Sequence, residues 1–361
     1  MVNLPQFVSE RRKLFLSICV AFVILLPALW FGLGHVIASQ ALRTPHGCGE
    51  WADNTPTNWT SDEDWTSFES HSDSENRISI RKDFNTSKWQ FDSFQNVNFT
   101  SRDGLRLVGW YTEVDPEAPV VIVVHGAGSY VNGKCKPEVI LTGSLLSDGG
   151  INTLLIDLRN QGFSQNVSDY FYIGQKEYND VLGAYDWLIE EHDYPPSSIG
   201  VTGISTGALS AIYAFDKSDM GSMWLESAIT DFPLLVKNEL SRLGYPGFLA
   251  DPAITMGSRM TGVDFTEMDA LDVASRIGDR SVFLVHGKED SRISTEHSQN
   301  FHDIAISNDS NSTIWIIEDG GHVDGVWEYT SEYQEKMVEF FSSSLTPKSV
   351  SYTHLTLPTR R

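Results

Sequence analysis

The chain has 361 residues and a formal net charge of −22, from 48 Asp and Glu against 26 Lys and Arg. This charge excludes nucleic acid as an expected partner, because binding phosphates needs clustered Lys and Arg. The length leaves room for an anchor, a linking segment and one large domain, since α/β domains of roughly 200 to 250 residues commonly stay single.

An apolar segment follows basic residues near the N-terminus. No Asp, Glu, Lys or Arg occurs between Lys13 and Arg43, and residues 14–33 are almost all apolar. This segment is long enough to cross a bilayer, which needs roughly 20 such residues. The positive-inside rule then places the N-terminus in the cytoplasm and the rest of the chain outside. The alternative is secretion after signal cleavage near Ala38, but a signal peptide's apolar core is usually only about 7 to 15 residues long.

The chain divides into five expected parts. These are a cytoplasmic N-terminus (1–13), a transmembrane anchor (14–38), a polar stalk (39–90), a large domain (91–345) and a tail (346–361). Tryptophans in the stalk are expected to pack on the domain rather than touch lipid headgroups. Cys48 and Cys135 are the possible disulfide pair, because Cys19 lies inside the apolar segment, but nothing further supports a bridge. Residues 349–361 resemble a translated sequencing adapter, so they carry no fold inference.

Strands alternate with helices in the large domain. Two extended runs flank the turn at 101–104, which predicts a β-hairpin. Further apolar runs predict buried strands at 119–124, 152–158, 198–204, 222–229, 281–285 and 312–317. Helical periodicity occurs between them, as in 175–191, and again at 331–343. This alternation predicts an α/β fold with a mostly parallel sheet covered by helices on both faces.

A G-x-S-x-G pattern stands at residues 203–207, between a predicted strand and a predicted helix. In such an elbow the turn is so tight that glycines are needed at its edges, and the serine hydroxyl projects above the sheet. The helix N-terminus also favours developing negative charge. We therefore expect Ser205 to be a nucleophile. The alternative is a plain strand-to-helix turn.

A serine nucleophile needs a base, and the base needs a carboxylate that fixes its tautomer. Asp290 and His322 each follow a predicted strand, so both should lie at the same sheet edge as Ser205. The order Ser, Asp, His also matches the one that accompanies this kind of elbow. Asp231 is the rival acid, with helix capping as its alternative role. Glu289 is a weaker rival and is expected to be exposed.

The other histidines have simpler expected roles. His125 and His286 follow strands directly and are expected to hold loops by hydrogen bonds. Four more lie in polar stretches and are expected to be solvated: His71, His192, His297 and His302. His322 differs from all of these, because the two glycines before it free its loop to turn the ring toward the serine.

Backbone donors are also needed for the oxyanion of acyl transfer. The loop at 125–128 directly follows a strand, and we expect the N–H of Ala127 as first donor and that of Thr206 as second. A plain glycine-rich turn is the alternative. The loop is not a dinucleotide site, because the G-x-G-x-x-G pattern is absent.

An apolar cap is expected over about residues 232–271. Leu235 and Phe248 in this segment, with Tyr130 beyond the oxyanion loop, are candidates for the substrate pocket. Such a cap suits acyl or aromatic ester substrates. The alternative is that these side chains are ordinary core.

Several ordered motifs together resemble the serine-hydrolase branch of the α/β-hydrolase superfamily. They are the 125–128 loop, the stretches 157–164 and 226–231, the Ser205 elbow, the Asp290 loop and His322. More narrowly, they resemble membrane-tethered abhydrolase-domain proteins and their bacterial relatives, over about residues 94–345. The resemblance implies an α/β-hydrolase fold with a small cap, and Asp290 rather than Asp231 as the acid. Thr206 stands where Met or Gln is frequent in that family, which leaves the backbone donor intact.

The sequence thus predicts a serine hydrolase that cleaves carboxylic esters through an acyl-enzyme, acting as an esterase or lipase on lipid-like or small esters. Serine peptidase and thioesterase activities share the same machinery and stay open, as does a noncatalytic surface binding module of this fold. No metal or organic cofactor is expected. The expected partners are a small ester or lipid substrate and the membrane, and the sequence does not give the oligomeric state.

Overall fold

The computed structural model describes residues 4–61, 81, 84–127 and 133–348. The chain falls into two compact units. One, the helical unit, comprises Met1–Arg43 and Phe232–Phe265, and the other, the sheet unit, comprises Thr44–Asp231 and Thr266–Arg361.

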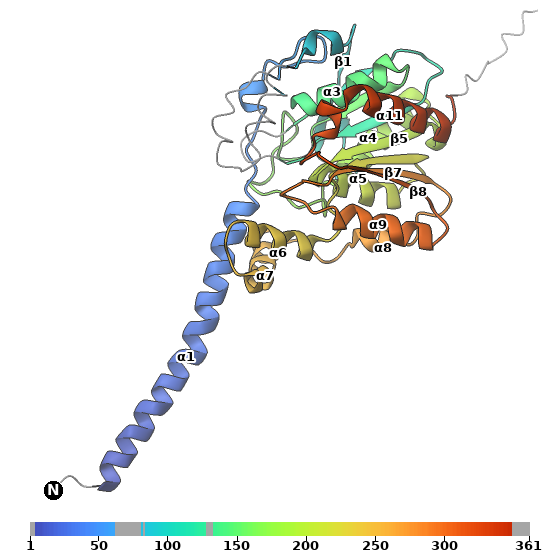
Figure 1. Ribbon diagram of the computed structural model, residues 1–361. Helices are drawn as coiled ribbons and strands as arrows, with labels where there is room; N and C mark the ends of the chain where they lie inside the picture. The colour runs from blue at the N-terminus through green and yellow to red at the C-terminus, as the bar shows by residue number, and fades with distance from the viewer. Residues whose placement is uncertain (1–3, 62–80, 82–83, 128–132, 349–361) are drawn as a thin grey trace, which may run out of the picture. The chain divides into compact units, whose positions relative to one another are not determined.

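An eight-stranded sheet forms the centre of the sheet unit (Figure 1). Its order is β1-β2-β4-β3-β5-β6-β7-β8. β2 pairs antiparallel with β1 and β4, and all other pairs are parallel. The strands are β1 (Gln95–Thr100), β2 (Arg106–Thr112), β3 (Val120–Val124), β4 (Asn152–Ile156), β5 (Ile199–Ile204), β6 (Ser222–Glu226), β7 (Ser281–Gly287) and β8 (Asn311–Ile317). The predicted hairpin and all six further predicted strands are present. The prediction that 312–317 is buried is wrong, because β8 lies at the edge of the sheet and only its last residue, Ile317, is buried.

Helices cover both faces of this sheet, as the sequence predicts. One face carries α4 (Tyr178–His192), α5 (Thr206–Asp216), α8 (Ala270–Ala274) and α9 (Glu296–Ser307). The other carries α3 (Pro137–Asp148), α10 (Gly325–Glu328) and α11 (Thr330–Ser344). Strands covered on both sides need no polar alternation, and all five residues of β3, Val-Val-Ile-Val-Val, are buried. Short 3-10 turns occur at η1 (Gly49–Trp51), η3 (Thr86–Trp89) and η4 (Pro196–Ser198).

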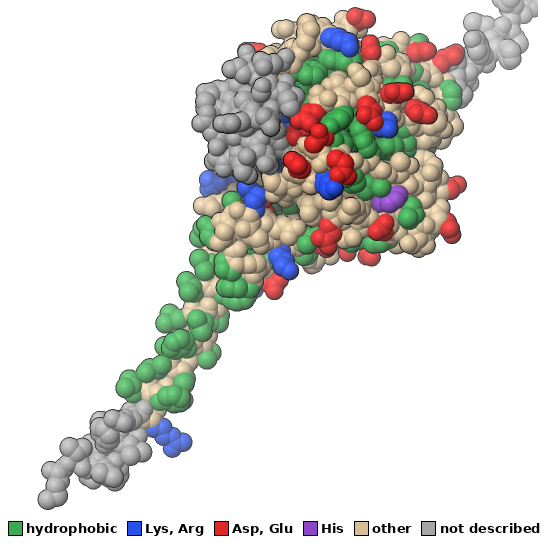
Figure 2. Space-filling view, viewed as in Figure 1, with side chains coloured by type: hydrophobic (Ala, Val, Ile, Leu, Met, Phe, Trp, Pro, Cys, Tyr) green, Lys and Arg blue, Asp and Glu red, His purple; other side chains and the backbone are tan. Residues whose placement is uncertain are grey.

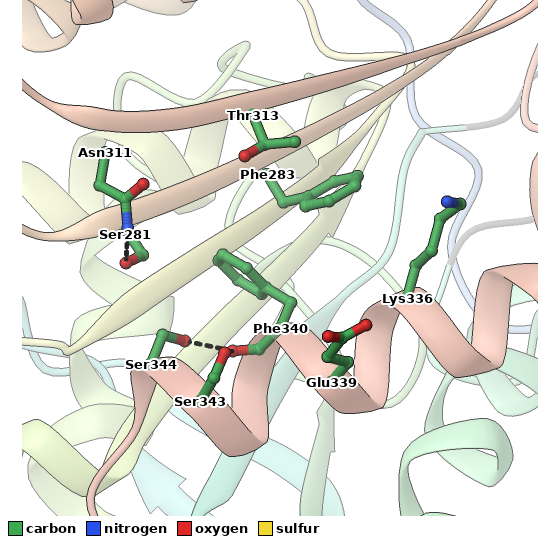
Figure 3. A pocket seen from close by; sticks show the side chains of 9 residues that line it. All are labelled: Ser281, Phe283, Asn311, Thr313, Lys336, Glu339, Phe340, Ser343 and Ser344. Atoms are coloured by element: carbon green, nitrogen blue, oxygen red, sulfur yellow. Dashed lines mark hydrogen bonds between the residues drawn. The ribbon is translucent and has the colours of Figure 1, made fainter.

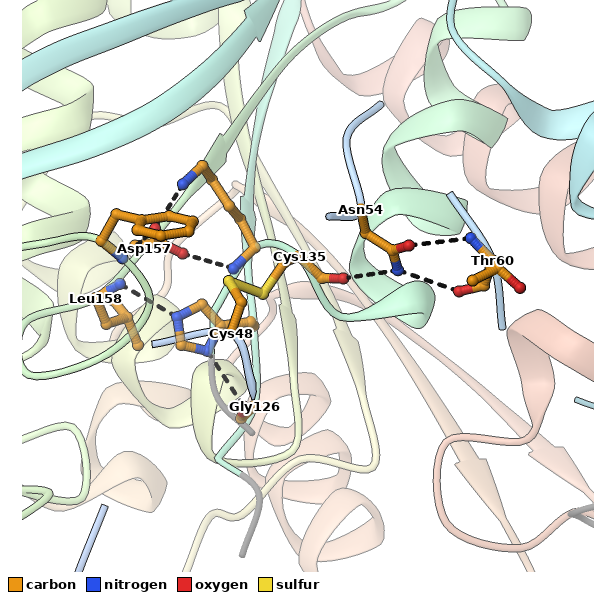
Figure 4. The surroundings of a disulfide bond; sticks show 10 residues. Cys48, Asn54, Thr60, Gly126, Cys135, Asp157 and Leu158 are labelled. Carbon is orange, nitrogen blue, oxygen red and sulfur yellow. Dashed lines mark hydrogen bonds and ion pairs between the residues drawn. A yellow bond between two sulfur atoms is a disulfide. The ribbon is translucent and has the colours of Figure 1, made fainter. Parts of the chain in front are cut away.

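The segment expected to be a polar stalk packs on the sheet unit over its described residues. Trp51, Trp59 and Trp89 are buried in the same apolar cluster as residues of β3 and α3, as expected for these side chains. Cys48 and Cys135 form a disulfide (Figure 4). Beside it, the Asn54 amide donates hydrogen bonds to the carbonyl oxygens of Cys135 and Thr60. This segment is therefore covalently and sterically part of the sheet unit.

The helical unit contains α1 (Leu4–Ala41), α6 (Phe232–Arg242), η5 (Gly247–Leu249) and α7 (Ala250–Thr261). Within α1, the 30 residues Arg12–Ala41 are long and apolar enough to cross a membrane or to act as a signal sequence. Figure 2 shows apolar side chains along this helix. The segment expected to form the cap thus contains α6, η5 and α7.

Removal of the disulfide should destabilise the protein. The bridge links residues 87 apart, and a closed loop of this length restricts the unfolded chain by roughly 4 kcal/mol. We expect Cys135→Ser to lower the free energy of unfolding by about that amount in urea titrations of the full chain in detergent. Cys19→Ser, which removes the free cysteine of α1, should have almost no effect. Equal stability of the two variants would contradict a structural role for the bridge.

Candidate active site

Ser205 lies at the turn between β5 and α5 in a strained backbone conformation, with φ of 56° and ψ of −119°. A positive φ is uncommon for a residue with a side chain and marks a constrained turn. A Cβ at Gly203 would lie 2.6 Å from the Cα of Ala208, and one at Gly207 would lie 2.3 Å from the carbonyl oxygen of His125. Both glycines are therefore required by close approach, which is the reason the sequence analysis gave for them.

The structure brings His322 and Asp290 together. His322 Nδ1 and Asp290 Oδ2 are 2.8 Å apart and hydrogen-bonded. Asp290 Oδ1 accepts two backbone N–H bonds, from Arg292 and Ile293, at 2.9 Å each. His286 Nε2 lies 3.4 Å from Asp290 Oδ2. The carboxylate is thus fixed in one orientation and presents one oxygen to the His322 ring.

Electrostatics keep this buried carboxyl ionised. Burial by itself would raise the pKa of Asp290, but the charge of His322 and hydrogen bonds from His286 and His322 hold that pKa well below its ordinary value. Partner groups that stabilise the ionised form lower a carboxyl pKa in this way. Asp290 can therefore stabilise a positive charge on His322 without taking up a proton itself.

The loop that carries His322 crosses the ends of two strands. A Cβ at Gly287, the last residue of β7, would lie 2.3 Å from the carbonyl oxygen of Gly320. Val323 N–H donates to Ser227 Oγ at 3.1 Å. The residue before Ser227, Glu226 of β6, accepts the Ser205 N–H at its backbone carbonyl oxygen, at 2.9 Å. The loop thus reaches from the end of β8 over β7 to the residues that hold the elbow at the end of β5.

Arg81 is a contact of this loop that sequence reasoning did not identify. Its guanidinium donates to the carbonyl oxygen of His322 at 3.3 Å and to Asp324 Oδ1 at 3.2 Å. Asp324 Oδ2 accepts the N–H of Gly321 at 2.9 Å. Val323, between these contacts, has a φ of 60°, which is strained for a β-branched residue. Arg81 and Asp324 therefore hold the strained loop on both sides of His322. The carboxylate of Asp324, two residues after His322, could have indicated from the sequence that this loop binds a cation. Nothing in the sequence around Arg81 indicates that Arg81 is that cation.

The expected oxyanion donors lie next to each other. Ala127 N–H donates to the side-chain hydroxyl of Thr206 at 2.6 Å. The loop and the start of α5 are therefore in direct contact, as the sequence predicts for two donors of one site. In this state the N–H of Ala127 is engaged by the Thr206 hydroxyl, a bond that the sequence does not predict.

The rival residues occupy other positions. Asp231 N–H donates to Nδ1 of His297, and Glu289 is exposed.

The prediction that His297 is solvated is wrong. Its ring is buried, and burial lowers its pKa to about 4. The ring accepts a hydrogen bond from the backbone between β6 and α6. Its polar neighbours Glu296 and Gln299 are exposed, while His297 and Ser298 face inward. His125 holds a loop as predicted, with Nε2 accepting the N–H of Leu158 at 3.2 Å.

The candidate pocket residues are less defined. Leu235 is half-buried on α6, Phe248 is 60 % exposed, and Tyr130 lies outside the described residues.

A depression of about 350 Å³ lies between α11 and the starts of β7 and β8 (Figure 3). Its lining residues Ser281 and Asn311 begin these strands, so it lies at the opposite sheet edge from Asp290 and takes no part in the site. Among the described residues, no group of three or more His, Cys, Asp or Glu side chains is placed to hold a metal ion.

Loss of the Arg81 guanidinium should reduce turnover more than stability. Arg81→Met removes the bonds that hold the His322 loop, and misplacement of a catalytic group by about 1 Å can cost roughly 10²-fold in rate. We expect kcat to fall by up to about that factor with KM little changed, and Arg81→Lys to recover part of it. Arg102→Met, which breaks an ion pair with Asp186, is the matched control. A fall in melting temperature that accounts for the whole activity loss would contradict the positioning role.

Glu226 gives the site a pH-dependent contribution to stability. Burial raises the pKa of Glu226 to about 7, and its Oε2 accepts the O–H of Tyr333 at 2.9 Å. Because the folded protein retains a proton that the unfolded chain releases near its ordinary pKa of about 4.3, stability is full below that pH and falls as the pH rises toward 7.

Replacing this carboxyl by an amide should remove that dependence. We expect Glu226→Gln to unfold with a free energy up to roughly 3 kcal/mol above that of the wild type at pH 8, and with little difference at pH 4. Denaturant titrations at the two pH values measure this. A difference that does not change between them would show that Glu226 is ionised in the folded protein.

Solved structures of hydrolases share this fold. An esterase of Pyrococcus furiosus aligns with 73% of this chain and 95% of its own, at a TM-score of 0.57 and 22% identity. An acylaminoacyl peptidase of Pyrococcus horikoshii aligns with 70% of this chain and 42% of its own, at a TM-score of 0.52 and 21% identity. At these identities the likeness concerns the fold, which is the α/β-hydrolase fold that the sequence motifs predict.

Proteins with similar sequences include an uncharacterized bacterial protein and a fungal thiohydrolase. YfhR of Escherichia coli, an uncharacterized protein, is 23% identical over 264 residues, covering 71% of this chain and 84% of its own. A thiohydrolase of Aspergillus aculeatus, AneE, is 28% identical over 129 residues, covering 35% of this chain and 39% of its own. The sequence pattern of the prolyl oligopeptidase family matches residues 139–348, more than half of the chain. The chain therefore belongs to the prolyl oligopeptidase family and is a serine hydrolase of the α/β-hydrolase superfamily.

Proposed function

We propose that this protein is a membrane-anchored hydrolase of carboxylic esters, with Ser205 as nucleophile, His322 as base and Asp290 as the acid that orients it. The observation that carries the proposal is the 2.8 Å hydrogen bond between His322 Nδ1 and Asp290 Oδ2, in a loop that reaches the residues holding the Ser205 elbow. Such a pair serves catalysis by keeping the proton on Nδ1, which leaves Nε2 able to accept one.

The reaction would proceed in two halves. Ser205 Oγ attacks the ester carbonyl while His322 Nε2 takes its proton, and the tetrahedral intermediate then expels the alcohol, which receives that proton. Water attacks the resulting acyl-enzyme by the same route and releases the acid. Asp290 stays ionised throughout, in keeping with its lowered pKa, and balances the charge on the imidazolium.

The oxyanion would be held by the backbone N–H groups of Ala127 and Thr206. Because the Ala127 N–H now donates to the Thr206 hydroxyl, we propose that the developing oxyanion takes the place of this hydroxyl as acceptor. The exchange keeps the buried N–H satisfied before and during the reaction. Loss of one such donor typically costs about 3 kcal/mol of transition-state stabilisation.

An ester substrate is favoured by the apolar cap and the apolar N-terminal helix, which together suit acyl chains near a bilayer. Peptide cleavage is the second candidate, because the chain belongs to a family named for a peptidase and shares its fold with an acylaminoacyl peptidase. Thioester cleavage is a third, supported by the likeness to a thiohydrolase. All three proceed through the same acyl-enzyme, so only the leaving group separates them.

Two observations support an anchored domain on the outer side of the membrane. The buried disulfide between Cys48 and Cys135 is of a kind that forms in oxidising compartments and is rare in the cytosol. The second concerns retention of α1. Ala38 and Leu42 are buried in the helical unit, so cleavage near Ala38 would remove part of that unit's core. We therefore favour the anchor over the signal peptide.

The proposal is tested by replacing the nucleophile. Ser205→Ala should abolish labelling by a fluorophosphonate probe and lower hydrolysis of p-nitrophenyl esters by about 10⁴-fold or more. Ser210→Ala, which removes a buried hydroxyl from α5, the helix that follows Ser205, is the matched control and should keep full activity. A folded wild type that the probe does not label would favour a noncatalytic binding module.

Substrate class is measured on the same preparations. A p-nitrophenyl ester series from short to long acyl chains, an N-acylaminoacyl p-nitroanilide and an acyl thioester separate the three candidates by their kcat/KM. The ester proposal requires that an ester has the highest kcat/KM. Among the esters, an optimum at long acyl chains would indicate a lipase, and one at short acyl chains would indicate a small-ester esterase. Preference for the anilide would replace it by peptidase activity.

A further inference from the structure

We propose that the segment from Leu243 to Phe248, which we call the cap tip, inserts into the outer lipid interface of the bilayer that α1 crosses and admits ester substrates from that leaflet. The inference rests on the proposed anchor and on the proposed ester hydrolase activity, and it adds the surface and the source of the substrate. The cap tip connects α6 to η5 within the helical unit.

Close packing fixes the cap against the anchor helix. A Cβ at Gly34 of α1 would lie 2.4 Å from the carbonyl oxygen of Pro252 in α7, and one at Gly257 of α7 would lie 2.9 Å from the side chain of Leu42, the residue that follows α1. Small residues at such positions let two helices approach closely. Ile37 of α1 also packs against the small buried cluster of the cap. The position of the cap along α1 is therefore set by backbone contact.

Two aromatic contacts show which level of α1 the cap tip reaches. The ring of Phe248 stacks on Trp30 with centroids 5.5 Å apart. The guanidinium of Arg259, on α7, lies 5.6 Å from the ring centroid of Phe31. Tryptophan at the headgroup level, with an arginine beside it, is the usual composition of a membrane interface. Phe248 of the cap tip thus lies at the level of Trp30, and Arg259 of α7 lies at the level of Phe31.

The length of α1 places that level at the outer boundary of the hydrocarbon. Lys13 and Phe31 are 18 residues apart, which is about 27 Å at 1.5 Å per residue. The hydrocarbon core is about 30 Å thick. With the Lys13 charge at the inner boundary, Phe31 and the stacked Phe248 therefore reach the outer interface.

The composition and exposure of the cap tip suit this location. Leu243 is 55 % exposed, Tyr245 52 % and Phe248 60 %, and no charged residue occurs between Arg242 and Asp251. Exposed apolar clusters of this kind mark interaction surfaces. Continuity with the apolar surface of α1 selects lipid as the occupant, and a second copy of the chain is the alternative that the experiment must exclude.

Depth-sensitive fluorescence tests the location in vesicles of phosphatidylcholine and phosphatidylglycerol. Full-length Leu243→Cys and Tyr245→Cys proteins, each with Cys19→Ser, carry an environment-sensitive label, and nitroxide lipids act as quenchers. We expect quenching of both labels. Ile306→Cys in the same background, a residue of α9 that is 48 % exposed, is the matched control and should not be quenched. A label on native Cys19, inside the span, reports whether α1 is inserted.

A pair of glycine variants tests whether the close contact between α1 and α7 holds the cap tip at this depth. Gly34→Ala places a methyl group against Pro252, whereas Gly32→Ala meets no atom within 4 Å. Both gain the same helix propensity. Quenching at Tyr245→Cys should be lost in the first and kept in the second. Fluorophosphonate labelling of Ser205 checks that the sheet unit stays folded in each.

Activity tests the source of substrate. Leu243→Ser with Tyr245→Ser should lower hydrolysis of an ester carried in the vesicles by about tenfold and leave hydrolysis of soluble p-nitrophenyl acetate unchanged. If the Cys19 label is quenched but the cap-tip labels are not, the membrane contact of the cap tip is wrong and the anchor stands. If the Cys19 label is also unquenched, both the cap-tip contact and the anchor are wrong. Failure of the probe to label Ser205 in the wild type would instead contradict the proposed catalytic role of Ser205. Quenching that is weak at high protein density and rises as the protein is diluted in lipid would assign the surface to a second copy.

Discussion

Parallel pairing of β3, β5, β6, β7 and β8 is the constraint on which the site depends. Parallel strands deliver all their carboxyl ends to one edge of the sheet, so residues far apart in sequence meet there without any special interaction between them. Ser205 follows β5, Asp290 follows β7 and His322 follows β8. The depression beside α11 lies at the opposite edge, where the strands begin. It is lined by polar residues such as Ser281 and Asn311, but its lining contains no group of nucleophile, base and acid.

Strain and buried charge at this edge are compensated by neighbouring groups. Ser205 and Val323 both have positive φ, and such backbone persists only where its surroundings fix it. The elbow is held by the N–H bond of Ser205 to Glu226, and the His322 loop by Ser227, Arg81 and Asp324. The ionised Asp290 is compensated in the same manner, by His322 and two backbone N–H groups. The N-terminal segment therefore contributes to the site through one arginine, although it lies outside the α/β core.

Features with a local signal could be predicted from the sequence. Apolar runs located every strand of the parallel sheet, and the glycines of 203–207 located the elbow. Features set by tertiary packing could not be predicted. Arg81 lies in a polar stretch with no motif, and His297 has polar neighbours but faces inward on an amphipathic helix. The sequence predicts the backbone N–H of Thr206 as a donor, whereas the bond between its hydroxyl and Ala127 depends on the tertiary approach of the residues that follow β3. The catalytic roles themselves stay predictions.

The N-terminal region serves both units by different means. Up to Arg43 it belongs to the helical unit, where Ala38 and Leu42 fill the core beside α7; from Thr44 it belongs to the sheet unit, through Cys48 and Arg81. The cap itself leaves the sheet unit after Asp231 and returns at Thr266. A helix that only tethered the enzyme would need no such packing, because any apolar span of sufficient length holds a protein at a bilayer. With the proposed membrane placement, the backbone contact at Gly34 would let α1 set the depth of the cap in the bilayer, so that the proposed anchor would serve substrate access as well as localisation.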